Sequence, residues 1–206
     1  MENNTEWLAV GCILISCIPY AWRIWIDDKK NVNPSLATWI LWNINSLTIF
    51  LTYREVNHGE NIEVVIASLI DTTIIVVLLL IKSKGKFILK GRMERLSFGG
   101  TLVLILFWVF AQNLNHLLGI AFILSIVIEL TSSYSQMMSN FSRPDKERPF
   151  AWIIYGLGYT ISYFSIKEIS FYTIILPIFM SIFYFLMSVP LVAYRIKNKI
   201  HITKWV

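Results

Sequence analysis

The sequence reads Asn33-Pro34-Ser35-Leu36-Ala37-Thr38-Trp39-Ile40-Leu41-Trp42-Asn43-Ile44-Asn45-Ser46 at the start of one of its long apolar segments. Proline suits the first turn of a helix, so we expect a helix to begin at Pro34. Two tryptophans and two asparagines then stand in a segment otherwise suited to lipid. Polar amides are costly in hydrocarbon unless they line a cavity or bond to neighbouring helices. The segment therefore predicts a membrane helix with a functional polar face.

A weaker copy of this segment follows 113 positions later and reads Pro149-Phe150-Ala151-Trp152-Ile153-Ile154-Tyr155-Gly156-Leu157-Gly158-Tyr159. At this offset Trp39 falls on Trp152, and Trp42 falls on Tyr155. Two basic segments match at the same offset: 81–86 and 194–199. An internal match at a fixed distance indicates that the chain consists of two related halves.

The composition is that of a membrane protein. Of the 206 residues, 56% are hydrophobic and 15% are charged, and the mean hydropathy is +0.61. Soluble domains are usually about 45–50% apolar. The charged residues cluster between long apolar runs, which leaves little room for a soluble domain. The net charge of +5 follows these membrane-flanking clusters and does not indicate nucleic-acid binding.

Seven apolar runs divide the chain, and we expect seven transmembrane helices. If the N-terminus lies outside, 16 of the 18 Lys and Arg residues fall in cytoplasmic segments, and only Arg54 and Lys167 lie outside. Cytoplasmic loops are enriched in Lys and Arg, so this distribution predicts an external N-terminus and a cytoplasmic C-terminus. The expected location is a bacterial inner membrane or a plasma membrane.

Two triple-helix units that both begin outside and end inside are parallel repeats, and they need one more helix between them. We therefore expect a first repeat at 1–86, a basic loop with an inversion linker helix at 87–113, and a second repeat with a basic tail at 114–206. The predicted fold class is an all-α membrane protein, with seven transmembrane helices arranged as two parallel triple-helix repeats joined by a linker helix. Transporters with such repeats hold their substrate between the halves, near the bilayer midplane.

The order of three, one and three helices, the Pro19-Tyr20 pair, the Asn33-Pro34 opening and the segment from Trp39 to Asn45 together resemble the SWEET and PQ-loop transporter superfamily. The resemblance implies alternating access around a central pocket, for a sugar, an amino acid or cystine, in some members with protons. It also implies hinges at the prolines that bend the helices: Pro19, Pro177 and Pro190. The nicotinamide riboside transporters share the helix order and a Trp-x-x-Trp pair, and we rank this resemblance second.

The predicted pocket lies between the second and sixth helices. Aromatic faces stack on sugar rings, nucleobases or cations, while amides and hydroxyls fix a solute's orientation. The candidate binding residues share these properties: Trp39, Trp42, Asn43, Ser46, Trp152, Tyr155 and Tyr159. Packing or an interfacial belt is the alternative role for the tryptophans, and hydrogen bonding between helices is the alternative for the asparagines.

Two acidic residues are candidates for proton coupling. Asp71 lies near the middle of the third apolar run, and Glu129 lies nearer the inner end of the fifth. An ionised carboxylate is costly at such depth, so each should be protonated or should meet a cation such as a solute amine. The alternative for both is structural pairing, for Asp71 with Thr72 or Thr73.

The predicted function is a multi-pass membrane transporter that moves a small polar solute by alternating access, with proton coupling left open. The solute is a sugar, an amino acid or a vitamin-like molecule. A receptor or sorting protein of the same fold, which binds a ligand without moving it, is the alternative. No catalytic motif is recognisable, and the three His and two Cys are too scattered for a metal site, so neither an enzyme nor a cofactor is expected. The expected partners are the solute and the lipid bilayer, without nucleic acid, and a homo-oligomer is left open.

Overall fold

The computed structural model describes residues 3–26, 36–57, 60–83, 91–111 and 114–205. Within these ranges the chain is helical and has no strand. Its elements are α1 (Asn3–Ile26), α2 (Leu36–Val56), α3 (Ile62–Ser83), α4 (Arg92–Ala111), α5 (Asn115–Ser142), α6 (Pro149–Tyr163), α7 (Phe171–Lys197) and the short 3-10 helix η1 (Ile202–Lys204). The predicted helix start at Pro34 lies outside the described residues.

Local sequence explains where the helices of the second half begin. Pro149 occupies the first turn of α6, where its missing N–H leaves no hydrogen bond unmade. Helix α7 is preceded by Ser170, whose side chain accepts a hydrogen bond from the backbone N–H of Thr173, while the Thr173 hydroxyl accepts one from the N–H of Ser170. This reciprocal pair satisfies two backbone donors that a helix end leaves free.

The bundle buries polar and charged side chains beside its apolar core, and it exposes many large apolar side chains. Buried side chains include Asn45, Asp71 and Glu129, whereas large apolar side chains such as Val103 and Phe110 face outward and are exposed. A soluble protein would bury such apolar side chains and keep most of its charged groups in water. An apolar exterior of this extent is what lipid covers in a membrane protein.

Five of the described helices are long and apolar enough to cross a membrane by length and composition: α1, α3, α4, α5 and α7. This result supports an all-helical, multi-pass membrane protein, although seven spans were predicted. The two α-helices that do not meet this criterion of length and composition are α2 and α6. Helix α2 is interrupted by tryptophans, asparagines and hydroxyl side chains, and α6 has only 15 residues. They are also the two helices that carry the repeated tryptophan segment.

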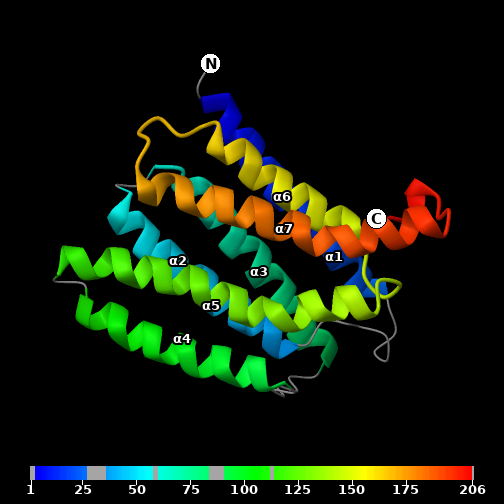
Figure 1. Ribbon diagram of the computed structural model, residues 1–206, viewed down its shortest axis with the longest axis horizontal. Coiled ribbons are helices and arrows are strands. Elements are labelled where there is room, and N and C mark those ends of the chain that lie inside the picture. The colour runs from blue at the N-terminus through cyan, green and yellow to red at the C-terminus, as the bar shows by residue number, and fades with distance from the viewer. Residues whose placement is uncertain (1–2, 27–35, 58–59, 84–90, 112–113, 206) are drawn as a thin grey trace.

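The packing of the helices places α4 at the edge of the bundle, beside α5 (Figure 1). Helix α3 lies between α1 and α2, and α7 lies between α5 and α6. Two further contacts cross from the first half of the chain to the second: α1 packs against α6, and α2 packs against α5. The interior is therefore bounded by six helices, with α4 outside them.

Candidate functional site

A pocket lies inside the bundle and receives side chains from every helix except α4. It encloses about 420 Å³ of space between its atoms, with the open solvent at its mouth included. The lining residues are Ser16 and Tyr20 of α1, Trp39 and Trp42 of α2, Asp71 and Thr72 of α3, Glu129 of α5, Ala151, Trp152 and Tyr155 of α6, and Tyr184 of α7.

The structure brings six of the predicted site residues together in this pocket: Trp39, Trp42, Asp71, Glu129, Trp152 and Tyr155. The other three predicted binding residues do not line it. The Asn43 amide donates hydrogen bonds to the hydroxyls of Thr72 (3.2 Å) and Thr73 (2.7 Å), so it links α2 to α3. Ser46 is buried away from the pocket, and Tyr159 stacks on Tyr184 behind the lining, with ring centroids 6.1 Å apart.

The three prolines predicted as hinges lie within helices that reach the pocket. Pro19 is inside α1 and directly precedes the pocket residue Tyr20. Pro177 and Pro190 are inside α7, on either side of Tyr184 along the helix. A proline removes a helical hydrogen bond and weakens its helix locally. Each proline therefore marks a point where a pocket helix bends more easily.

Aromatic rings form a continuous wall around the pocket. Trp39 and Trp42 meet edge to face, with centroids 4.8 Å apart and planes at 77°. Trp42 meets Trp152 in the same way at 6.0 Å and 83°, and Trp152 stacks on Tyr184 at 6.0 Å. Tyr20 closes the wall 5.1 Å from Trp39. Rings at steep angles to one another present both faces and edges to anything bound between them.

The indole N–H groups of Trp39, Trp42 and Trp152 are buried and have no hydrogen-bond partner among the described residues. Buried N–H groups are rarely left unpaired in native proteins. Three such groups on residues that share one pocket indicate a ligand or water that accepts their hydrogen bonds.

Asp71 is buried, with 4% of its surface exposed, and one of its carboxyl oxygens, Oδ1, has no hydrogen-bond partner in the part of the chain that the structure describes. The Cys17 thiol of α1 lies near this carboxyl. The predicted alternative partners are engaged elsewhere, because the hydroxyls of Thr72 and Thr73 donate to backbone carbonyls one turn earlier. Asp71 therefore retains a free acceptor inside the pocket.

Glu129 is equally buried but better bonded. Its Oε2 accepts a hydrogen bond from the side-chain amide of Asn45, which also donates to the backbone carbonyl of Ser125 at 3.2 Å. Asn45 thereby ties α2 to α5 and holds one oxygen of Glu129 in place. The two asparagines of the α2 segment thus serve contacts between helices, Asn43 to α3 and Asn45 to α5.

Five pocket residues were not among the sequence candidates: Ser16, Tyr20, Thr72, Ala151 and Tyr184. Two of them follow from the repeat itself, since Ser16 precedes Glu129 by 113 positions and Tyr184 follows Asp71 by 113 positions. Applying the offset to the acidic candidates would have found both. The repeat in the sequence therefore contains a signal for both positions.

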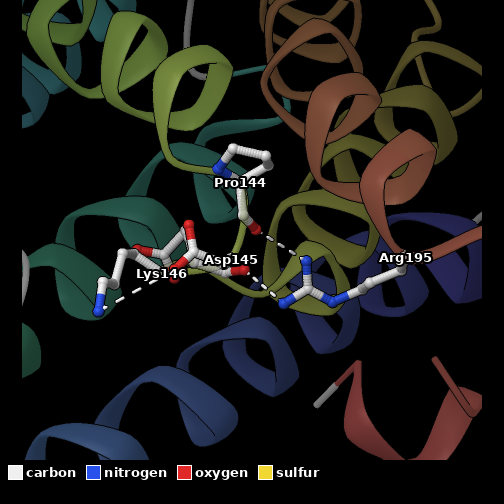
Figure 2. A network of polar contacts seen from close by, with 5 residues as sticks. Pro144, Asp145, Lys146 and Arg195 are labelled. Carbon is white, nitrogen blue, oxygen red and sulfur yellow. Dashed lines mark hydrogen bonds and ion pairs between the residues drawn. The ribbon is translucent and has the colours of Figure 1, made fainter. Parts of the chain in front are cut away.

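A buried polar network that centres on Glu147 and Arg195 adjoins the pocket at one end of the bundle. The Tyr20 hydroxyl, which lines the pocket, donates to the Glu147 carboxylate at 2.9 Å. The Arg195 guanidinium donates to the backbone carbonyls of Glu147 (2.6 Å), Pro144 (3.1 Å) and Leu191 (3.2 Å). Figure 2 shows Arg195 turned toward the loop that contains Pro144, with the exposed Lys146 and Asp145 beside it. The network ties the ends of α1 and α7 to the loop that precedes α6.

At the opposite end of the bundle, two turns from the two halves of the chain contact each other. The Glu60 carboxylate, in the turn between α2 and α3, accepts hydrogen bonds from the backbone N–H groups of Lys167 and Glu168 in the turn between α6 and α7. The Asn61 amide donates to the Ser162 carbonyl at 3.1 Å and accepts from the Ser165 hydroxyl at 2.8 Å. Asn61 has a φ of 53°, a conformation that Asn tolerates better than most residues.

Comparison with known proteins leaves the site to be interpreted from its own geometry. No family model matches the chain, and neither the curated proteins nor the solved structures give a significant match.

Proposed function

We propose that the protein is a membrane transporter that binds a small polar solute in the central pocket and moves it by alternating access between two related halves. The single observation that carries the proposal is the composition of the pocket. Eight of its eleven lining residues form four pairs at the repeat distance of 113: Ser16 and Glu129, Trp39 and Trp152, Trp42 and Tyr155, Asp71 and Tyr184. A pocket on the axis that relates two repeats receives equivalent positions from each, which is the arrangement of transporters built from repeats.

The helix packing supports the same two halves. In each half the third helix lies between the other two, giving the order α1, α3, α2 and the order α5, α7, α6. The contacts between halves are also equivalent, because α1 packs on α6 as α5 packs on α2. Helix α4 stands outside this arrangement and is the proposed inversion linker between two parallel triple-helix repeats. The seven-span topology of the SWEET and PQ-loop transporters is the architecture that this proposal adopts.

Alternating access requires contacts at both ends of the pocket that can break in turn. The Glu147 and Arg195 network and the Glu60 and Asn61 contacts meet this requirement, since they lie at opposite ends of the pocket and involve hydrogen bonds rather than interlocked apolar cores. By the distribution of basic residues, the first is cytoplasmic and the second is external.

The proposed orientation predicts which side of the membrane each end faces. A cysteine replacing Ile169, which is 81% exposed in the turn between α6 and α7, should react with a membrane-impermeant thiol reagent in intact cells. A cysteine replacing Lys197, exposed at the end of α7, should react only after the cells are permeabilised. The unsubstituted chain, with its native Cys12 and Cys17, serves as the background control. Labelling in the opposite order would overturn the orientation.

Closing the external end permanently should stop transport. Glu60→Cys and Lys167→Cys place two thiols at the contact between the external turns, and a short bifunctional thiol reagent should join them. We expect flux to fall to the level of empty vesicles after cross-linking and to recover when a reductant cleaves the link. Each single-cysteine variant, treated identically, should retain its flux. Full flux through the cross-linked protein would exclude opening at this end.

The proposal is tested by uptake into proteoliposomes that contain the purified full-length protein. A panel of radiolabelled sugars, amino acids and small organic cations is offered, and each solute's binding is measured on the same preparation. Saturable uptake of a solute that also binds supports transport. Saturable binding of a solute with no uptake of any member would instead favour the receptor or sorting alternative.

A further inference from the structure

The pocket presents two carboxyl groups, one from each half of the chain, and no opposite charge among the described side chains that line it. Asp71 of α3 and Glu129 of α5 are each 4% exposed. No Lys, Arg or His side chain belongs to the lining. Asp71 Oδ1 is without a hydrogen-bond partner in the described part of the chain. Burying two carboxyl groups in one cavity is costly unless protons or a cation neutralise them.

The aromatic wall is suited to a cation. Six rings line the same pocket as the two carboxyl groups: Tyr20, Trp39, Trp42, Trp152, Tyr155 and Tyr184. The face of an aromatic ring attracts a cation electrostatically, and tryptophan does so most strongly. Rings set at 77° and 83° to their neighbours form the corner of a box, so a compact charge can contact more than one face at once. Cages of this kind recognise ammonium groups that carry methyl or methylene substituents.

The unpaired indole N–H groups add a second requirement. Three donors on Trp39, Trp42 and Trp152 need acceptors, which the aromatic wall itself does not supply. A solute with a hydroxyl or carbonyl oxygen near its charged nitrogen satisfies both sets of groups. A simple metal ion brings no apolar surface for the rings and no acceptor for the indoles.

We propose that the solute of this pocket is a small organic cation, with its positive nitrogen held between Asp71, Glu129 and the aromatic wall. The inference rests on the proposed function, because it takes the pocket to be the solute site. A single positive charge neutralises one of the two carboxylates, and a proton on the other leaves the occupied site without net charge. Binding of the cation and binding of a second proton therefore compete for the same oxygens.

The test uses binding to the purified full-length protein in detergent, followed by intrinsic tryptophan fluorescence and by thermal stability. The probes are three cations of different shape, tetramethylammonium, choline and 2-phenylethylammonium, with two neutral analogues, 3,3-dimethylbutan-1-ol for choline and 2-phenylethanol for 2-phenylethylammonium. Glucose represents a neutral polar solute. We expect at least one cation to bind saturably and at least tenfold more tightly than its neutral analogue, which corresponds to about 1.4 kcal/mol.

Substitution of Asp71 and Glu129 tests whether their carboxyl groups bind the positive charge of the solute. Asp71→Asn and Glu129→Gln keep side-chain shape and remove the charge, and each should weaken binding of the preferred cation at least tenfold. Glu168→Gln, at an exposed position in an external turn, should leave binding unchanged. If Asp71→Asn fails to yield folded protein, Glu129→Gln and the comparison of analogues on the unsubstituted chain still decide the matter.

Three outcomes would overturn the inference: equal affinity for a cation and its neutral analogue, saturable binding of glucose without any cation, or no saturable binding of any of the three cations. Failure of the proposed function has a different signature. If a cation binds in the expected way but is not taken up by proteoliposomes, the result supports the cation site and contradicts the proposed transport function. If a neutral solute is taken up and no cation binds, the result supports the proposed transport function and contradicts the cation site.

Discussion

We expect Asp71→Asn to abolish the response of solute flux to a proton gradient. Asp71 is buried in the pocket with a free carboxyl oxygen, so protonation and hydration at this position change whenever the pocket opens to one side. Asparagine keeps the shape of the side chain but cannot exchange a proton. We expect a transported solute to accumulate against its gradient in the unsubstituted protein when a pH difference is imposed, and to equilibrate only passively in the variant. Flux in proteoliposomes with and without a pH difference measures this.

Matched substitutions provide a control and test whether Glu129, rather than Asp71, carries the coupling proton. Asp145→Asn removes an exposed carboxylate from the loop before α6 and should leave the gradient response intact. The other titratable groups around the Asp71 carboxyl are Cys17 and the hydroxyls of Tyr155, Tyr159 and Tyr184. If Glu129→Gln loses the response and Asp71→Asn keeps it, the coupling proton belongs to Glu129. An equal response in all the variants would leave both acids as structural residues.

We expect Arg195→Ala to lower the stability of the folded protein substantially. The buried guanidinium donates to three backbone carbonyls, and alanine leaves these acceptors without their charged donor. Removing such bonds costs about 3 kcal/mol or more. For a chain of this length, that corresponds to a decrease of about 6–12 °C in the unfolding temperature. Thermal unfolding of the detergent-purified protein, followed by size-exclusion chromatography after heating, measures the change.

Two further variants separate the role of the guanidinium from a general loss of positive charge. Arg143→Ala removes an exposed arginine from the same end of the bundle and should change the unfolding temperature little. Arg195→Lys keeps the charge but loses the planar fork that reaches several carbonyls, so it should recover only part of the stability. Equal stability of Arg195→Ala and Arg143→Ala would show that the network does not hold this end together.

The helical, membrane-type character of the chain could be predicted because length, apolar runs and charge clusters encode it directly. The pocket could be predicted in part, because the Trp39 and Trp42 pair recurs in α6 at a fixed distance. The role of Asn43 could not, since the sequence does not show which neighbour a helix face meets. On α2, Trp42 faces the pocket while the adjacent Asn43 faces Thr72 and Thr73 of α3. Adjacent residues of a helix point in different directions, so a shift of one position decides whether a side chain faces the pocket or the neighbouring helix.

The contacts of Glu60 and Arg195 also could not be predicted from the sequence. Glu60 is one of several charged residues in polar turns, and nothing local distinguishes it from Glu55 or Glu168. Its role depends on the close approach of two turns about a hundred positions apart. Likewise, nothing in the sequence distinguishes Arg195 from the other basic residues that follow the apolar runs, although its side chain is buried. The roles of Glu60 and Arg195 both depend on contacts between segments that are far apart in the sequence.

The shortness of α6 has an electrical consequence. Its 15 residues span about 22 Å, whereas the hydrocarbon layer is about 30 Å thick. If α6 crosses the membrane as proposed, water at both of its ends would reach deeper into the membrane than around the longer helices, and the membrane voltage would fall mainly across the thin layer that contains the pocket. A unit charge that crosses this layer gains or loses about 2.3 kcal/mol for each 100 mV. In a cell whose interior is negative, the resting potential alone would draw a positively charged solute inward through this site.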